Sequence, residues 1–86
     1  MIEKTILITN PSGLHTRPAK KVVDTAKSFG SEIIIVKDGH EETAKNLLKL
    51  MKLGISSGTS IIVRCSGFDE EMALTSIEEV LNSLTE

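Results

Sequence analysis

A histidine and an arginine stand two positions apart in the segment PSGLHTRPA, residues 11–19. Gly13 belongs to a predicted turn before them, and Pro18 falls in the first turn of a predicted helix, where its missing N–H costs no hydrogen bond. His15 therefore lies where unpaired helix N–H groups point towards its ring. Such an end binds anions, and together with the charge of Arg17 it disfavours the cationic imidazole. A neutral ring with a free lone pair is a nucleophile.

A phosphoryl group on His15 would meet several hydrogen-bond donors that are already in place. These are the helix N–H groups, including that of Thr16, the guanidinium of Arg17 and the hydroxyl of Ser12. Phosphoryl transfer requires mainly positioning and charge stabilisation, and a guanidinium fork matches phosphate oxygens. The cluster therefore indicates phosphoryl transfer through a histidine intermediate. From the spacing alone, the alternative that His15 is only a polar neighbour of a helix stays open.

The composition predicts one folded domain over residues 1–86 and argues against several classes of partner. Apolar residues make up 40% of the chain and charged residues 26%, values typical of a folded protein. With two aromatic residues, both Phe, and a net charge of −2, the chain lacks the stacking platforms and the basic field that nucleic acids require. We therefore expect no nucleic acid partner.

The remaining composition favours a cytoplasmic protein. Cys65 is the only cysteine and lies in an alternating apolar run, so we expect a small core residue in a reducing compartment. The first ten residues lack the basic and apolar regions of a secretory signal. The longest apolar run, Ile33–Val36, is far shorter than the roughly 20 residues that cross a bilayer. We expect no membrane insertion.

Hydrophobic periodicity predicts the element order βαββαβα. Strands are expected where apolar and polar residues alternate or β-branched residues dominate, over residues 2–9, 32–37, 40–43 and 60–65. Helices are expected from apolar stripes over about residues 16–28, 46–53 and from 69 to the end of the stripe at Leu84. Each helix has an apolar side that needs to be covered. The economical packing is an α+β two-layer domain with helices on one face of a sheet.

Turn and capping residues set the ends of these elements. Asp38-Gly39 predicts a tight hairpin between the second and third strands. Gly30 and Gly54 are expected to stop the first two helices. Asn46 is a good N-cap for the second helix, and Asp69 is expected to cap the third.

The string PSGLHTRPA resembles the active-site signature of the HPr family, the histidine-containing phosphocarriers of the bacterial sugar phosphotransferase system. KNLLKLMKLGI resembles the second helix of that family, and SGTSIIVRCSGFDEEMAL resembles its fourth strand and the start of its third helix. The resemblance covers essentially the whole chain. It implies an open-faced sandwich with four antiparallel strands in the order 1-4-2-3 and three helices on one side.

The resemblance also implies a function. His15 would accept a phosphoryl group on Nδ1 from phospho-enzyme I, which takes it from phosphoenolpyruvate, and would pass it to enzyme IIA proteins, with Arg17 assisting. Such a protein is a stoichiometric carrier rather than a turnover enzyme, so its status as an enzyme is left open. No metal ion or cofactor is expected, and we expect a monomer.

One position departs from the family pattern that this resemblance brings. Members carry a serine at the start of the second helix, which a regulatory kinase phosphorylates in some lineages, and this chain has Asn46 there. Asparagine caps a helix as well as serine does but cannot be phosphorylated. Control through that position is therefore not expected, and Thr43 is the nearby hydroxyl that could replace it.

The second helix carries more apolar residues than one buried face can use. We expect Leu47 and Met51 to form an apolar patch near the histidine, ringed by Lys20, Lys49 and Lys52, that docks acidic partner surfaces. The alternative that these apolar residues belong to the core stays open. A second function also stays open: a regulatory binding module that acts through this helix without transferring phosphate.

Overall fold

Seven elements follow one another along residues 1–86 of the computed structural model. The strands are β1 (Ile2–Leu7), β2 (Glu32–Lys37), β3 (His40–Thr43) and β4 (Ser60–Ser66), and the helices are α1 (Thr16–Lys27), α2 (Leu47–Lys52) and α3 (Glu70–Ser83). Every predicted element is present. The first strand ends at Leu7 rather than at residue 9, because the backbone of Ile8 bonds to the loop before β4 instead of to a ladder.

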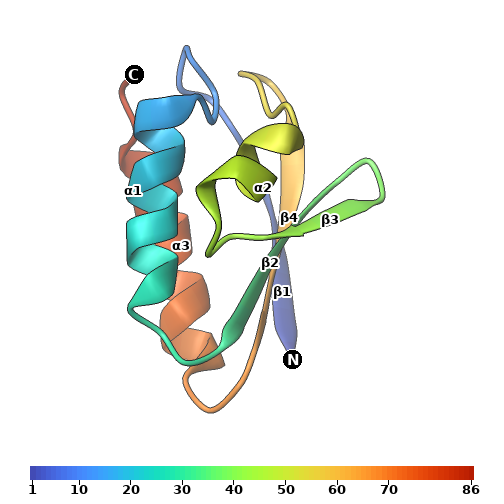
Figure 1. Ribbon diagram of the computed structural model, residues 1–86, viewed down its shortest axis with the longest axis vertical. Helices are drawn as coiled ribbons and strands as arrows, with labels where there is room; N and C mark the ends of the chain where they lie inside the picture. The colour runs from blue at the N-terminus through green and yellow to red at the C-terminus, as the bar shows by residue number, and fades with distance from the viewer.

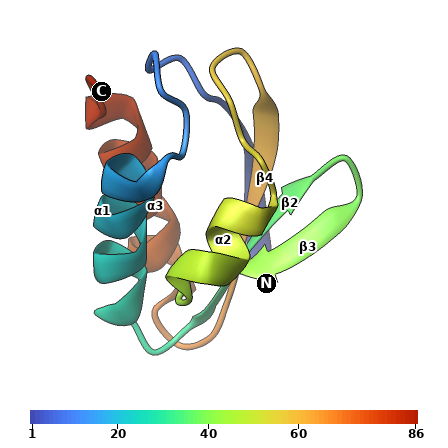
Figure 2. The same ribbon diagram turned by 45° about the horizontal axis from the view of Figure 1, so that its top comes forward.

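The four strands form one antiparallel sheet in the order β1-β4-β2-β3, as the resemblance implied. All three helices lie on one face of this sheet, with α1 and α3 side by side and α2 next to α1 and β3 (Figures 1 and 2). The α+β open-faced sandwich is confirmed. None of the helices has the combination of length and apolar character that a membrane span requires.

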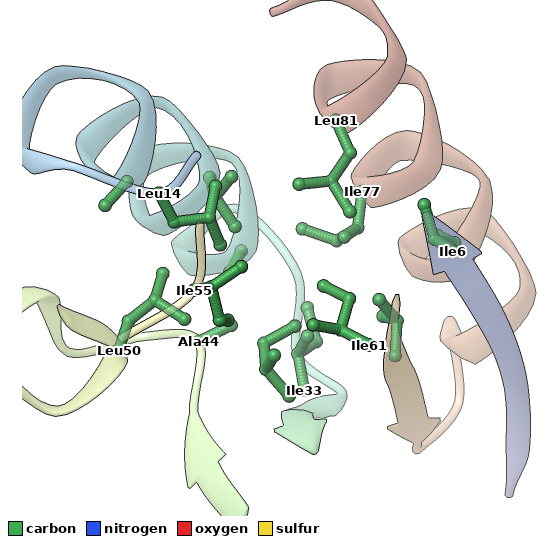
Figure 3. Packing of buried hydrophobic residues seen from close by; sticks show 14 of the residues in the cluster. Ile6, Leu14, Ile33, Ala44, Leu50, Ile55, Ile61, Ile77 and Leu81 are labelled. Atoms are coloured by element: carbon green, nitrogen blue, oxygen red, sulfur yellow. The ribbon is translucent and has the colours of Figure 1, made fainter. Parts of the chain in front are cut away.

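The core lies between the sheet and the helices. In β4, Ile61 and Val63 point inward and are buried, whereas Ile62 points to the other face and is partly exposed. Ile33 and Ile61 from the sheet face Ile77 of α3 across the interior (Figure 3). Cys65 is fully buried in the same core. Burial first, and then the nearby carboxylates of Glu70 and Asp69, raise the pKa of this thiol.

The predicted turns around β2 and α2 are confirmed. Asp38 and Gly39 both have positive φ, 50° and 80°, and join β2 directly to β3 in a two-residue hairpin. Gly54, with φ of 63°, follows the last residues of α2 and ends that helix. Lys37 donates its Nζ to the carbonyl oxygens of Leu53 and Gly54, at 3.1 and 3.0 Å, so the end of α2 is tied to the hairpin.

Two of the predicted helix ends are formed differently. Asp69 stands before α3 but makes no side-chain cap. Its carboxylate accepts the amides of Gly30 and Ser31, at 3.0 and 2.9 Å, and the Ser31 hydroxyl. The capping role predicted for Asp69 is therefore wrong, because Gly30 and Ser31, which directly precede β2, offer these donors. Gly30 does not have a positive φ; its lack of a side chain makes room for the Phe68 ring, which would lie 2.4 Å from a Cβ.

Candidate functional site

His15 is the N-cap residue of α1 and is exposed to solvent. Its backbone is extended, with φ of −71° and ψ of −178°, and its ring makes no capping hydrogen bond. The carbonyl of His15 accepts the Ala19 amide at 2.8 Å, which starts the helix. The ring is therefore free to meet a partner, while the backbone on both sides of it is fixed.

The loop before His15 packs closely against the loop that follows α2. The Leu14 amide donates to the Ile55 carbonyl at 2.9 Å, and the Leu14 side chain is buried. Gly13 has φ of 60°, and a Cβ there would lie 2.4 Å from the Ile55 oxygen and 2.6 Å from the Ser56 Cα. Only glycine fits this conformation and this space. Because Leu14 points inward, its neighbour His15 is directed outward.

Beside the ring lies an open pocket of about 310 Å³. It brings together two of the predicted phosphoryl-binding or acceptor residues, Ser12 and His15, with residues of α2 and the loop after it. The lining residues are Ser12, Leu14, His15, Met51, Gly54, Ile55 and Ser56. Thr16, also predicted to bind the phosphoryl group, directs its hydroxyl towards the Met51 sulfur at 4.0 Å.

The backbone donors at this end of α1 are few and defined. Pro18 has no N–H, and the Ala19 amide is used by the His15 carbonyl. This leaves the amides of Thr16 and Arg17 as the unpaired donors of the first turn. They add to the positive end of the helix dipole at the position of the imidazole.

Arg17 is paired with an acidic residue from the opposite end of the chain. Its Nη1 lies 3.5 Å from Glu86 Oε2, and its side chain is 84% exposed. Lys21 Nζ lies 3.2 Å from Glu86 Oε1. Hydrogen bonding and charge from Lys21, with a smaller contribution from Arg17, hold the pKa of the Glu86 carboxyl below its usual range. Sequence reasoning missed Glu86, because no local pattern links residues 69 positions apart.

Helix α2 presents an apolar residue that sequence reasoning did not single out. Leu50 is buried, and Leu47 and Met51 are partly buried against the core. Leu48 is 74% exposed. The sequence pattern could have predicted that Leu48 is exposed. Leu47, Leu50 and Met51 have the i, i+3, i+4 spacing of one helix face, and Leu48 lies off that face.

The lysines predicted to ring the patch are exposed but do not all lie together. Lys20 pairs with Asp24 one turn further along α1, with Nζ 2.9 Å from Oδ2. Lys49 lies on the exposed side of α2. Lys52 lines a different pocket, together with residues of the β2–β3 hairpin that include Asp38 and His40. No group of three or more His, Cys, Asp or Glu side chains has the arrangement of a metal site.

Asn46 occupies the N-cap position of α2, as predicted. Its Oδ1 accepts the Lys49 amide at 3.0 Å. The alternative hydroxyl, Thr43 Oγ1, accepts the amide of Lys45 at 3.1 Å and is partly buried at the end of β3. Thr43 is thus held within a turn, whereas the Asn46 position is exposed.

Comparison with known proteins gives the family. A family model described as the PTS HPr component phosphorylation site matches residues 2–83. The chain belongs to the HPr family. The phosphocarrier protein HPr of Buchnera aphidicola subsp. Baizongia pistaciae is 42% identical over 84 residues, which cover 98% of this chain and 99% of that protein.

The solved structures of HPr proteins agree with this assignment. The crystal structure of HPr-C-His from Thermoanaerobacter tengcongensis has a TM-score of 0.94 at 40% identity and covers 96% of this chain and 93% of that one. A crystal structure of an HPr dimer from the same organism has a TM-score of 0.78 at 40% identity, with 96% and 95% covered. The sheet order and the three helices described above are therefore those of the HPr fold.

Proposed function

We propose that this HPr-family protein carries a phosphoryl group on His15, accepting it from phospho-enzyme I and passing it to enzyme IIA proteins of sugar uptake. The observation that carries this proposal is the exposed, uncommitted ring of His15 at the amide end of α1, beside an open pocket. A nucleophile that must reach two successive partners has to be accessible. The surrounding backbone contacts hold it in one position.

The transfer step balances without a cofactor. The neutral ring nitrogen of His15, Nδ1 by the family resemblance, attacks phosphorus; the new N–P bond forms as the bond from phosphorus to the donor breaks, and the donor keeps that electron pair. Transfer to enzyme IIA is the same displacement with the partner as nucleophile. The free amides of Thr16 and Arg17 and the Ser12 hydroxyl stabilise the phosphoryl oxygens.

Arg17 changes partner in this scheme. An exposed ion pair with 3.5 Å between charged atoms contributes little stability. A doubly negative phosphoryl group close to the guanidinium competes effectively with the single carboxylate of Glu86. Arg17 therefore stabilises the phosphorylated state at little cost to the unphosphorylated one.

The partner surface is the exposed side of α2 together with the start of α1. Leu48, with the partly buried Leu47 and Met51, supplies apolar contact area. Lys20 and Lys49 supply positive charge around it. Such a surface fits partners with an apolar contact bordered by acidic side chains.

The decisive test combines the purified protein with phosphoenolpyruvate and enzyme I and measures its mass. We expect an acid-labile gain of one phosphoryl group that is absent in His15→Ala, and its loss when an enzyme IIA is added. Absence of any gain with enzyme I from the same cell would reject the carrier. It would instead favour the regulatory binding module acting through α2.

The partner surface has a separate test. Leu48→Glu places a carboxylate where acidic partners approach, so we expect slower phosphorylation at limiting carrier concentration. Leu47→Glu tests the half-buried position in the same assay. Glu79→Lys, an exposed change on α3, is the control for altered charge. Unchanged transfer in Leu48→Glu and Leu47→Glu would reject the surface.

The proposed carrier is cytoplasmic and monomeric. The protein acts in the cytoplasm, where phosphoenolpyruvate and reduced thiols are found, and it works as a monomer, since one exposed histidine suffices for the transfer. Light scattering at the concentrations of the transfer assay is the measurement. A stable dimer that transfers phosphate would contradict the monomer and leave the carrier chemistry standing.

A further inference from the structure

Asn10 is one of two buried polar residues in the protein, with 3% of its surface exposed. Its Nδ2 donates to the Gly13 carbonyl at 2.7 Å and to the main-chain oxygen of Glu86 at 3.5 Å. Because both partners are acceptor oxygens, the nitrogen of the amide has to face them. The side chain thus joins the loop before His15 to the far end of the chain.

Backbone hydrogen bonds complete this junction. The Gly13 amide donates to the Asn10 carbonyl at 3.1 Å, and the Ser12 amide donates to the same main-chain oxygen of Glu86 at 2.7 Å. The loop that carries Ser12 and Gly13 is therefore held by Asn10 and Glu86 on one side. On its other side it is held by the Leu14 to Ile55 hydrogen bond.

Asn10 bonds to Gly13 and Glu86, and each of these residues is connected to one of the candidate site residues, His15 or Arg17. The Gly13 carbonyl stands two residues before His15 in a loop that admits no side chain at that position. Glu86, whose main-chain oxygen accepts a hydrogen bond from Asn10, pairs through its side-chain carboxylate with Arg17 and Lys21. The Asn10 amide thus contacts both the loop that carries His15 and the residue that pairs with Arg17.

We propose that Asn10 is a positioning residue for phosphoryl transfer at His15. It fixes the loop that sets the ring, and it holds Glu86 where the carboxylate pairs with Arg17 and Lys21. This inference rests on the proposed carrier function and adds to it a residue that touches neither the phosphoryl group nor the partners.

The pattern of its hydrogen bonds supports this role over simple filling of the core. Asn10 Oδ1 is buried and accepts no hydrogen bond from the protein. Burying an acceptor without a partner opposes folding, so this amide is a poor choice for stability alone. What it supplies is a pair of donors at a fixed place under the active-site loop.

The test compares Asn10→Ala with Ser31→Ala, which alters the other buried polar residue. Ser31 is 1% exposed and bonds to Asp69. It lies in the connection between α1 and β2, which is at the opposite end of the molecule from the start of α1 (Figure 1). Both changes remove a buried hydrogen bond, so both lower stability. We expect Asn10→Ala to slow transfer from enzyme I by about tenfold, since small displacements of a reacting group are costly. Ser31→Ala should leave that rate unchanged.

A second readout separates positioning from stability. NMR signals of the His15 ring and the Arg17 guanidinium should shift in Asn10→Ala and stay in place in Ser31→Ala. Should Asn10→Ala fail to fold, Asn10→Leu keeps about the size of the side chain and removes the donors without burying a charge, and the same changes are expected. Parent-like rates, or parent-like signals of both side chains, in a folded Asn10 variant would overturn the inference.

The two proposals fail in different ways. If the parent protein takes no phosphoryl group on His15, the carrier function is rejected, and the NMR signals still decide whether Asn10 positions the ring and the guanidinium. If the parent is phosphorylated and the Asn10 variants match it, only the positioning role is rejected.

Discussion

At the scale of single residues, the site depends on positions that carry no reactive group. Gly13 allows a left-handed turn against a neighbouring loop, and the buried Leu14 directs His15 outward. Glu86 pairs with Arg17 from the far end of the chain. The His15 ring itself makes no side-chain capping contact. The position of His15 is therefore set by its neighbours.

Gly13→Ala should destabilise the protein and disturb His15. A left-handed conformation costs a residue with a Cβ about 1–2 kcal/mol, and the Cβ would also meet the Ile55 oxygen at 2.4 Å. Gly39→Ala is the matched control, because Gly39 also has positive φ but has nothing within 4 Å of a Cβ. Urea denaturation should give a larger loss for Gly13→Ala, with altered His15 NMR signals in that variant alone. Equal losses of unfolding free energy in the two variants would show that the loop around Ile55 moves to accommodate the Cβ at position 13.

Acid should release Arg17 from Glu86. The pKa of the Glu86 carboxyl is lowered from 4.5 in the folded protein, first by Lys21 and then by Arg17. The contribution of this contact to stability is therefore complete above the ordinary pKa and is lost as the pH falls through the lowered one. The NMR signal of the Arg17 guanidinium should move in that acidic range and should not do so in Glu86→Gln. A pH-independent signal in the parent would rule out the pair.

At the scale of elements, the local sequence predicts those turns and helix ends that depend only on residues close together along the chain. The hairpin at Asp38-Gly39, the cap at Asn46 and the stop at Gly54 were all predictable, because each depends on residues within one turn. The role of Asp69 was not, because its hydrogen-bond partners stand 38 and 39 positions away. Asp69 does occupy the position before α3, but its side chain bonds to Gly30 and Ser31, just before β2, and does not cap the helix.

Asn46→Ala should remove the cap of α2. Loss of such a side-chain hydrogen bond costs about 1 kcal/mol, and Asn46 Oδ1 accepts the Lys49 amide at 3.0 Å. Asn46→Ser should be close to the parent, because serine caps equally well. Chemical denaturation of the three proteins is the measurement. A serine variant as unstable as the alanine variant would contradict a capping role.

Asp69 should make stability sensitive to acid. Its pKa is lowered by the Ser31 hydroxyl first, against some desolvation, and also by the amides of Gly30 and Ser31. This stabilisation is present above the ordinary pKa and is lost as the pH falls through the lowered value. Melting temperatures measured between about pH 2 and 6 should fall less steeply towards acid in Asp69→Asn than in the parent. Glu71→Gln, on an exposed residue, should keep the slope of the parent.

At the scale of the whole molecule, hydrophobic pattern and helix amphipathicity were sufficient to predict a sheet covered on one face. The order of the strands came from the family resemblance, since alternation alone does not say which strands are neighbours. The candidate site was predicted as far as its sequence motif extends. Glu86 escaped prediction because it joins the motif from the far end of the chain. The role of Asn10 escaped because its second hydrogen bond goes to the main-chain oxygen of Glu86, 76 positions away.

The alternation in β4 makes a global prediction. Ile61 is 1% exposed and faces the helices, and Ile62 is partly exposed on the uncovered face. Ile61→Ala should cost about 2–5 kcal/mol, because it leaves a cavity in the core. Ile62→Ala should cost clearly less. Equilibrium unfolding measures both, and equal costs would mean that the outer face is as well packed as the inner one.

The candidate site and the turn between β4 and α3 lie at opposite ends of the molecule. The start of α1 and Glu86 lie at one end, and the turn between β4 and α3 lies at the other (Figure 1). Phe68 in that turn is 91% exposed, while the Cys65 thiol is buried and its pKa is raised, which makes it unreactive. Phe68→Cys therefore offers one site for a dye or a solid support, and a tethered protein would still present its histidine to solution.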